Sequence, residues 1–189
     1  LTKATEKSFV YREQVFALAW DYFDQDPARV EQVAADTPET RVTLAVFYSV
    51  RGAAADALRV WNSTPEDVRA RHVPILKNMT QRLYEKRHFR EALELARQAG
   101  IDPEASFESI SNPGFEKFFG DSASTIFGWH VNRSDSKLEI LPDPNVHSEG
   151  QRGLKLNFKG YNRPDLLNVS QLVAIQPGGR YRLTFMVRV

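Results

Sequence analysis

Carboxylates and histidines are the side chains of this sequence best suited to catalysis, because they transfer protons and bind metal ions. Five carboxylates could supply the acid and base of glycoside hydrolysis: Glu108, Glu116, Asp121, Asp135 and Glu139. That reaction needs two carboxyl groups flanking one bond, and no spacing here predicts such a pair. The histidines are too scattered for a His-x-x-x-His metal motif: His72, His88, His130 and His147. Phosphate-binding glycine loops and Gly-x-Ser-x-Gly motifs are also missing, so the sequence predicts a protein that is not an enzyme.

Composition argues against further classes of function. Lys plus Arg total 25 and Asp plus Glu total 24, so no net positive field attracts nucleic acid, and we expect no nucleic-acid partner. The sequence contains no cysteine, which excludes disulfides, thiolate zinc sites and cysteine nucleophiles. No apolar run approaches the roughly 18–20 residues that a membrane-spanning helix needs.

One loop combines the chemical groups that bind sugars. In Gly160-Tyr161-Asn162-Arg163-Pro164-Asp165, the ring of Tyr161 can stack on a sugar, and Asn162 and Arg163 can bond its hydroxyls. An ordinary polar connection between two strands is the alternative interpretation. The loop is therefore a candidate glycan-binding site.

Helices are expected to form the first part of the chain, residues 1–105. From Phe9 to about Gln98 apolar residues recur at helical spacing, and Val15, Leu18, Ala19, Tyr22 and Phe23 should share one buried face. Capping residues, prolines and glycines predict the breaks: Asp26-Pro27, Thr37-Pro38, Gly52, Ser63-Thr64-Pro65 and Gly100. The pattern predicts about six short helices joined by turns.

Two stretches of this helical part repeat each other. Residues 48–58 align with residues 83–93, so that Ala57 matches Ala92 and Leu58 matches Leu93. This spacing, with a small residue where two helices cross, resembles the tetratricopeptide repeat of about 34 residues. A weaker unit covers Phe16 to Ala34. The family's Trp-Leu-Gly signature is missing, so another repeat of helical pairs is the alternative, and both predict an α-solenoid of helical hairpins.

A repeat array of this kind exposes a concave face built from the first helix of each pair. We expect a protein-binding groove there with residues that lie off the apolar stripe: Arg41, Ser49, Asn78 and Arg82. An extended segment of a partner protein could lie on this face. The alternative is that the array is a spacer and that these residues are solvated surface.

After Asp102-Pro103 the apolar spacing changes to alternation. Leu154, Leu156 and Phe158 alternate with polar residues, and Leu138 with Ile140 and residues 181–187 behave in the same way. Alternation with one apolar face is typical of antiparallel, half-buried strands. We therefore expect an α+β chain of two parts, in which residues 106–189 form about six strands of an antiparallel β-sandwich.

Five landmarks occur in order in this second part: Asn112-Pro113-Gly114-Phe115-Glu116, Gly128-Trp129, His147-Ser148-Glu149-Gly150, Gln171-Leu172-Val173 and Pro177-Gly178-Gly179-Arg180-Tyr181. The series resembles the jelly-roll carbohydrate-binding modules of the xylanase and glucanase type. The resemblance covers residues 107–189 and implies a galactose-binding-like sandwich. It also implies that the last strands lie beyond Val189. Because the sequence starts at Leu1 rather than Met and ends within the strand-like residues 180–189, we expect both ends to be cuts from a longer protein.

The resemblance also implies roles for individual residues. Glu116 corresponds to a ligand of a structural calcium ion, for which hard oxygen donors are suited, and no other cofactor is expected. Gln171 corresponds to a residue on a strand that faces the ligand, so it joins Tyr161, Asn162 and Arg163 as a glycan-binding candidate. Trp129 is expected to be a core aromatic between sheets, with sugar stacking as the alternative.

These expectations combine into a non-catalytic binding and scaffold protein. Its repeats would contact a partner protein and its sandwich a polysaccharide, in assembly of a bacterial surface polysaccharide in the periplasm or cell envelope. The alternative is a structural protein–protein adaptor without a sugar site, and a more distant one is a glycosidase that has lost its catalytic domain. The strand-like residues 180–189 would leave an open sheet edge, which predicts self-association.

Overall fold

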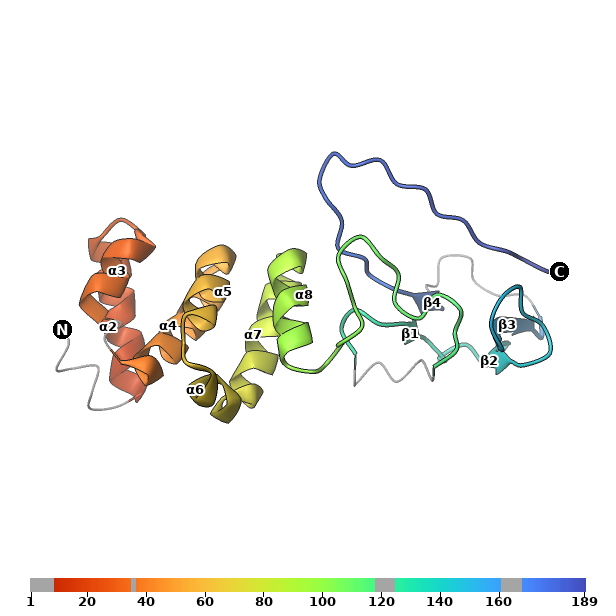
Figure 1. Cartoon of the computed structure of the whole chain (residues 1–189), viewed down its shortest axis with the longest axis horizontal. Helices are drawn as coiled ribbons and strands as arrows, with labels where there is room; N and C mark the ends of the chain where they lie inside the picture. The colour runs from red at the N-terminus through yellow and green to blue at the C-terminus, as the bar shows by residue number, and fades with distance from the viewer. Residues whose placement is uncertain (1–8, 35–36, 118–124, 161–167) are drawn as a thin grey trace. The chain divides into compact units, whose positions relative to one another are not determined.

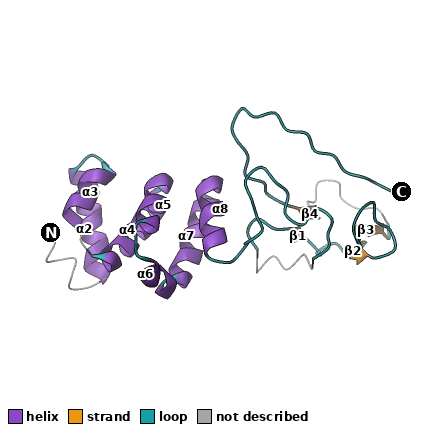
Figure 2. Ribbon diagram, in the orientation of Figure 1, coloured by secondary structure: helices purple, strands orange, loops and turns teal. Residues whose placement is uncertain are grey.

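The computed structural model describes residues 9–34, 37–117, 125–160 and 168–189, and the chain divides into two compact units, Leu1–Ala99 and Gly100–Val189 (Figure 1). Within these ranges the first unit contains helices and the second contains strands and loops (Figure 2). The predicted order of helices followed by antiparallel strands is thus confirmed. None of the helices in these ranges is long and apolar enough to cross a membrane.

The described part of the first unit contains seven helices: α2 (Phe9–Tyr22), α3 (Pro27–Ala34), α4 (Pro38–Arg51), α5 (Ala54–Asn62), α6 (Glu66–Arg71), α7 (Val73–Glu85) and α8 (Phe89–Gln98). Prolines and capping residues begin several of them, as expected. Thr37 caps α4 by accepting a hydrogen bond from Thr40 N (3.2 Å), and Asp26 caps α3 by accepting one from Ala28 N (3.0 Å).

Three helical hairpins, α2–α3, α4–α5 and α7–α8, close with the same backbone hydrogen bond. In each turn a backbone N–H donates to the carbonyl oxygen five residues earlier: Gln25 to Trp20 (2.8 Å), Ala53 to Tyr48 (3.0 Å) and His88 to Leu83 (2.9 Å). The residue before each donor has a positive φ: Asp24 (53°), Gly52 (83°) and Arg87 (66°). This left-handed residue lets the turn satisfy a carbonyl at the helix end. The α4–α5 and α7–α8 turns therefore share one local structure, since Ala53 and His88 have nearly equal dihedral angles, whereas the α2–α3 turn has a second positive φ at Gln25 (64°).

The hairpins pack against one another in chain order. Helix α4 contacts both α2 and α7, and α5 contacts α8. The largest fully buried side chains of this core are Trp61, Tyr48, Phe16, Leu44, Met79, Leu83 and Leu95. Between α2 and α4 the ring of Trp20 lies 5.9 Å from that of Phe47 and 5.6 Å from that of Tyr48. Burial of this apolar surface is the main stabilising term of the unit.

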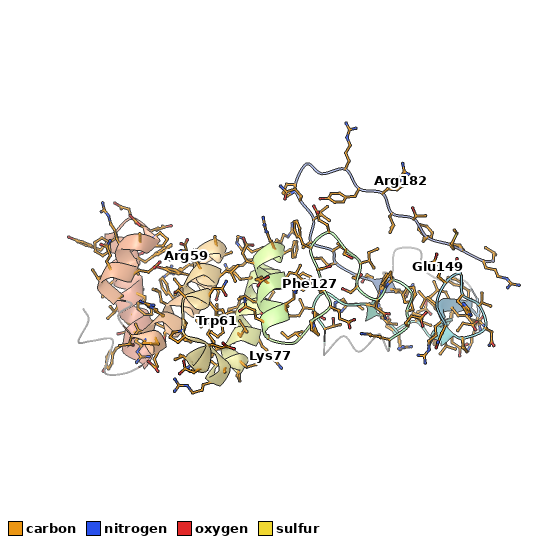
Figure 3. The ribbon with its side chains drawn as sticks, in the orientation of Figure 1. Arg59, Trp61, Lys77, Phe127, Glu149 and Arg182 are labelled. Carbon is orange, nitrogen blue, oxygen red and sulfur yellow. The ribbon has the colours of Figure 1, made fainter. Side chains whose placement is uncertain are left out.

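Polar bonds also join successive hairpins. The Tyr48 hydroxyl donates to Pro27 O (3.0 Å), and burial, followed by the nearby Glu31 carboxylate, raises the pKa of this hydroxyl well above its usual range. Arg59 donates to both carboxylate oxygens of Glu31 (2.9 and 2.5 Å), and Trp61 Nε1 donates to Gln98 Oε1 (3.0 Å). Figure 3 labels Arg59 and Trp61. Since Arg59 is half exposed, its ion pair adds little stability beside the buried Trp61.

The buried face of α2 differs from the predicted one. Val15 and Ala19 are buried as expected, but 66% of Leu18 and 81% of Tyr22 is exposed. Phe16 and Trp20 take their place in the core. The helix contacts both α3 and α4, so its buried surface turns toward Phe16 and Trp20 and leaves Leu18 and Tyr22 outside.

The second unit contains two small antiparallel sheets in its described part. Strand β2 (Leu138–Asp143) pairs with β3 (Gly153–Phe158), with Ile140 opposite Leu156. Strand β1 (His130–Val131) pairs with β4 (Val169–Ser170). The alternating residues around Leu138 and Leu156 thus form antiparallel strands as predicted, but Leu156 (42%) and Phe158 (59%) are exposed rather than buried.

The core of the second unit is small. Val131, Leu138 and Ile140 are buried, and four partly buried side chains pack on them: Phe115, Trp129, Leu154 and Val169. The Trp129 ring lies 4.8 Å from that of Phe115, and its Nε1 donates to Asn112 O (3.0 Å). Trp129 therefore has the predicted role of a core aromatic residue.

Two predicted strands are wrong. Gln171-Leu172-Val173 lies just after β4 and is not a strand, and residues 181–187 are extended but pair with no strand among the described residues. An alternating pattern becomes a strand only when a neighbouring backbone supplies hydrogen bonds. The described residues thus form four strands rather than about six, and the two-sheet sandwich stays a prediction.

Candidate functional site

A polar face runs along α7. Six residues recur at a spacing of three or four and are all exposed: Pro74, Lys77, Asn78, Gln81, Arg82 and Glu85. The opposite side of the helix is buried through Leu76, Met79 and Leu83. Figure 3 labels Lys77 on this helix. We call these six exposed residues the α7 polar face.

Hydrogen bonds within the α7 polar face hold its side chains. Arg82 Nε donates to Asn78 Oδ1 (2.7 Å), and Gln81 Nε2 donates to Glu85 Oε1 (2.9 Å). Each pair is four residues apart, so the two members lie one turn from each other. The face thus presents guanidinium, ammonium and amide groups, which suit the carbonyl and carboxylate oxygens of a bound peptide. Asn78 and Arg82 were predicted from the sequence, whereas Lys77, Gln81 and Glu85 were missed, although their spacing marks the same face.

The other two residues of the predicted groove lie on α4. Arg41 is half-buried, and its side chain or backbone already interacts with another group of the protein. Ser49 is fully buried, and its hydroxyl donates to Val46 O (2.7 Å). The prediction that Ser49 lies on an exposed surface is therefore wrong. Helix α4 packs between α2 and α7, so this side of the helix is covered.

Glu116 holds a loop of its own chain. Its Oε1 accepts hydrogen bonds from the backbone N–H groups of Gln151 (2.8 Å) and Arg152 (3.2 Å). A side chain at Gly150, whose φ is +73°, would displace this carboxylate and strain the backbone, so glycine is favoured there. Among the described residues no group of three or more histidines and carboxylates could hold a metal ion. The carboxylate oxygen predicted to bind calcium therefore already has backbone partners, and the calcium site stays a prediction.

The predicted glycan-binding residues are only partly described. Tyr161, Asn162 and Arg163 lie outside the described residues. The side-chain amide of Gln171 makes two hydrogen bonds to the backbone of Ser111. Its Oε1 accepts from Ser111 N (3.1 Å), and its Nε2 donates to Ser111 O (3.3 Å). In this conformation Gln171 fixes the segment around Ser111.

Asp102 is a structural residue that the sequence did not reveal. It is 8% exposed, and its carboxylate accepts hydrogen bonds from Ile126 N (2.8 Å), Phe127 N (2.8 Å) and the Thr125 hydroxyl. The same Thr125 oxygen accepts from Gly128 N (2.7 Å). More than twenty residues separate Asp102 from Thr125, so no local motif predicts these hydrogen bonds.

A second carboxylate holds the start of the segment 180–189. The Tyr181 hydroxyl donates to Glu108 Oε1 (2.6 Å) and accepts from Gln176 N (2.8 Å). The bond to Glu108 is the main reason that the pKa of the Tyr181 hydroxyl is raised. An ionised carboxylate stabilises the protonated phenol and disfavours the phenolate.

Replacing Glu108 with glutamine should lower the pKa of Tyr181 toward its usual value near 10. NMR titration of a sample with carbon-labelled tyrosine rings measures this pKa. Tyr48 serves as the internal control, because its raised pKa comes mainly from burial in the helical unit. An unchanged Tyr181 titration would show that the bond to Glu108 does not form in solution.

Comparisons with known proteins give no assignment: no family model matches the chain, and neither do curated proteins or solved structures.

Proposed function

We propose that this chain is a non-catalytic scaffold protein whose helical unit is a tetratricopeptide-like solenoid that binds a segment of a partner protein. The turn shared by the α4–α5 and α7–α8 hairpins carries this proposal, because repeated local geometry is typical of repeat arrays. The offset between the turns at Tyr48 and Leu83 is the one at which the sequence repeats. The packing of α4 between α2 and α7 adds further support.

The α7 polar face is the proposed contact with the partner. It lies on the first helix of its hairpin, where repeat proteins build their binding surfaces. Its charged and amide side chains can bond the backbone of an extended peptide without burial of a large apolar area. Lys77 and Arg82 outnumber Glu85 among the charged residues of this face, so an acidic segment is the preferred ligand.

This function is tested by selecting peptides that bind the full chain from a random peptide library. Binding of the selected peptides should fall about tenfold when Lys77 and Arg82 are both replaced by glutamate, because two attractive charges become repulsive. Fluorescence anisotropy measures the affinities, and circular dichroism checks that the helices are intact. The control is Arg90→Glu with Arg97→Glu on α8, which makes the same change in net charge. Equal weakening by both pairs would contradict a site on α7.

Glycan recognition by residues 106–189 is a second proposal, supported by the five landmarks of the carbohydrate-binding modules. The Asn-Pro-Gly-Phe-Glu landmark has a structural use here, since Phe115 packs on Trp129 and Glu116 holds the loop at Gly150. A glycan array followed by calorimetry tests this proposal. Absence of saccharide binding at millimolar concentration would leave the adaptor function, which the engagement of Gln171 with Ser111 favours.

A further inference from the structure

The turns of the α4–α5 and α7–α8 hairpins lie against each other. A β-carbon at Gly52 would lie 3.8 Å from Lys86 Cδ and 3.6 Å from His88 Nε2, so side chains of the second turn reach the first. Helix α4 also contacts α7, and α5 contacts α8, which brings the two turns side by side at the ends of these helices. Residues of both turns can therefore contact one ligand.

Positive charge gathers at these two turns. Arg51 ends α4, Lys86 and Arg87 lie in the second turn, and all three are exposed. Arg82 lies one helical turn before Lys86 on α7 and is also exposed. The whole chain has 25 basic and 24 acidic residues, whereas residues 82–91 contain four basic and two acidic ones. We call Arg51, Arg82, Lys86 and Arg87 the basic corner.

Contacts within the protein hold two arginines of the basic corner. The guanidinium carbon of Arg51 lies 5.2 Å from the centroid of the Phe47 ring, a cation–π contact. Arg82 Nε donates to Asn78 Oδ1 (2.7 Å), and a guanidinium has further N–H groups that can bind a ligand. Side chains that are already held lose less conformational entropy when they bind. These two guanidinium groups are thus preorganised for an anionic ligand.

The spacing of the basic corner indicates the form of that ligand. Arg82 and Lys86 are four residues apart, which corresponds to about 6 Å along the helix axis. In an extended peptide, side chains at alternate positions lie on one side and are about 6.8 Å apart. Carboxylates at alternate positions of a peptide therefore match these two cations, and guanidinium groups bind carboxylates through paired hydrogen bonds.

We propose that the basic corner binds a run of acidic residues, placed at alternate positions, in the partner segment that lies along α7. This inference rests on the proposed function, because Arg82 belongs both to the basic corner and to the α7 polar face. It adds the neighbouring hairpin to the site through Arg51, and it places the acidic end of the segment over the C-terminal end of α7. The corner continues into Asn78 and Gln81, whose amides suit a peptide backbone, so a peptide is the ligand.

Two fluorescein-labelled ten-residue peptides of equal composition test the spacing by fluorescence anisotropy with the full chain. Each contains three glutamates among serines and glycines. The first, third and fifth residues are glutamate in the alternating peptide, and the first, fifth and ninth in the spread peptide. At low ionic strength the alternating peptide should bind at least about fivefold more tightly, and added salt should weaken it. Equal affinities, or no saturable binding of the alternating peptide, would overturn the proposal.

Variants of the basic corner locate the site. Arg51→Glu with Arg87→Glu should weaken binding of the alternating peptide about tenfold, and the corresponding glutamine pair about threefold, because attraction is reversed in one and removed in the other. The control is Arg29→Glu with Arg97→Glu, at exposed positions of α3 and α8, which makes the same change in net charge as the first pair. Circular dichroism verifies that the helices are intact. Equal weakening by the control would show attraction without a site.

Two results distinguish this inference from the proposed function. Peptides selected from the library could respond to Lys77→Glu with Arg82→Glu but not to the Arg51 and Arg87 pair, which would leave the α7 site and overturn the basic corner. The alternating peptide could instead depend on Arg51 and Arg87 while the library yields no binder, which would support the corner alone. Trigalacturonate also carries three carboxylates and should bind more weakly. Equal or tighter binding of this sugar would assign the corner to an acidic polysaccharide and overturn the peptide ligand.

Discussion

Replacing Trp61 with alanine should lower the free energy of unfolding of the helical unit by about 3–5 kcal/mol. Trp61 is 1% exposed, and it is the largest fully buried side chain of the described residues. Truncation leaves a cavity between α5 and its neighbours and removes the hydrogen bond to Gln98 Oε1. Gln98 also donates to Asn62 Oδ1 (3.0 Å), so the loss loosens a polar link between α5 and α8. Urea unfolding followed by circular dichroism at 222 nm measures the effect.

Two further substitutions separate the causes of this loss. Trp61→Phe keeps much of the buried ring but loses the bond to Gln98, and it should cost about 1–2 kcal/mol. Leu18→Ala removes a large apolar side chain that is 66% exposed, so it should cost less than about 0.5 kcal/mol. A loss below about 1 kcal/mol for Trp61→Ala would show that this core is not packed as described.

Helical spacing predicted the helices of the first unit well because the residues that begin and end a helix act locally. The breaks at Pro27, Pro38 and Gly52 correspond to helix ends for local reasons of capping and φ. The face of α2 was predicted wrongly because Leu18 and Phe16 are equally apolar. Only the neighbouring helices decide which of the two is buried, and that information lies elsewhere in the chain.

The second unit was less predictable because its structure depends on distant partners. The β2–β3 hairpin joins neighbouring segments, and its alternation was sufficient to find it. The β1–β4 pair instead joins His130 to Ser170, and no local pattern indicates that register. Residues 181–187 alternate as clearly as β3 does, yet they lack a partner strand in the described part of the chain.

The candidate sites also divide into features that local residues predict and features that depend on distant parts of the chain. Asn78 and Arg82 are exposed as expected, because exposure on a helix follows from its period. Ser49 is buried against expectation, because α4 is covered on more than one side. In the second unit, Glu116 and Gln171 were singled out by family resemblance as ligand-binding residues. Both side chains bond to the backbone of their own unit instead. A sequence specifies polar side chains, but not whether they bind a ligand or the protein itself.

Asp102 gives the most direct test of these hydrogen bonds between a side chain and the backbone of its own unit. Replacing it with alanine should destabilise the second unit by about 2–5 kcal/mol, because the N–H groups of Ile126 and Phe127 lose a charged acceptor. Phe127 is 2% exposed, so water cannot readily replace that acceptor. Hydrogen exchange of these two amides, measured by NMR, should accelerate strongly, whereas amides of α4 should be unaffected.

Two further variants separate the effect of the hydrogen-bond acceptors of Asp102 from the effect of its negative charge. Asp102→Asn keeps one acceptor oxygen but turns an N–H group toward other donors, so it should cost about 1–3 kcal/mol. Glu104→Ala removes the same charge two residues away, where the carboxylate is exposed and pairs with Lys117, and it should cost less than about 1 kcal/mol. Asp102→Ala and Glu104→Ala could have equal effects on the exchange of the Ile126 and Phe127 amides. That result would show that negative charge near this loop stabilises it and that the hydrogen bonds to Asp102 do not. Selective loss of protection in the Asp102 variants would instead show that one buried carboxylate organises the entry into the second unit.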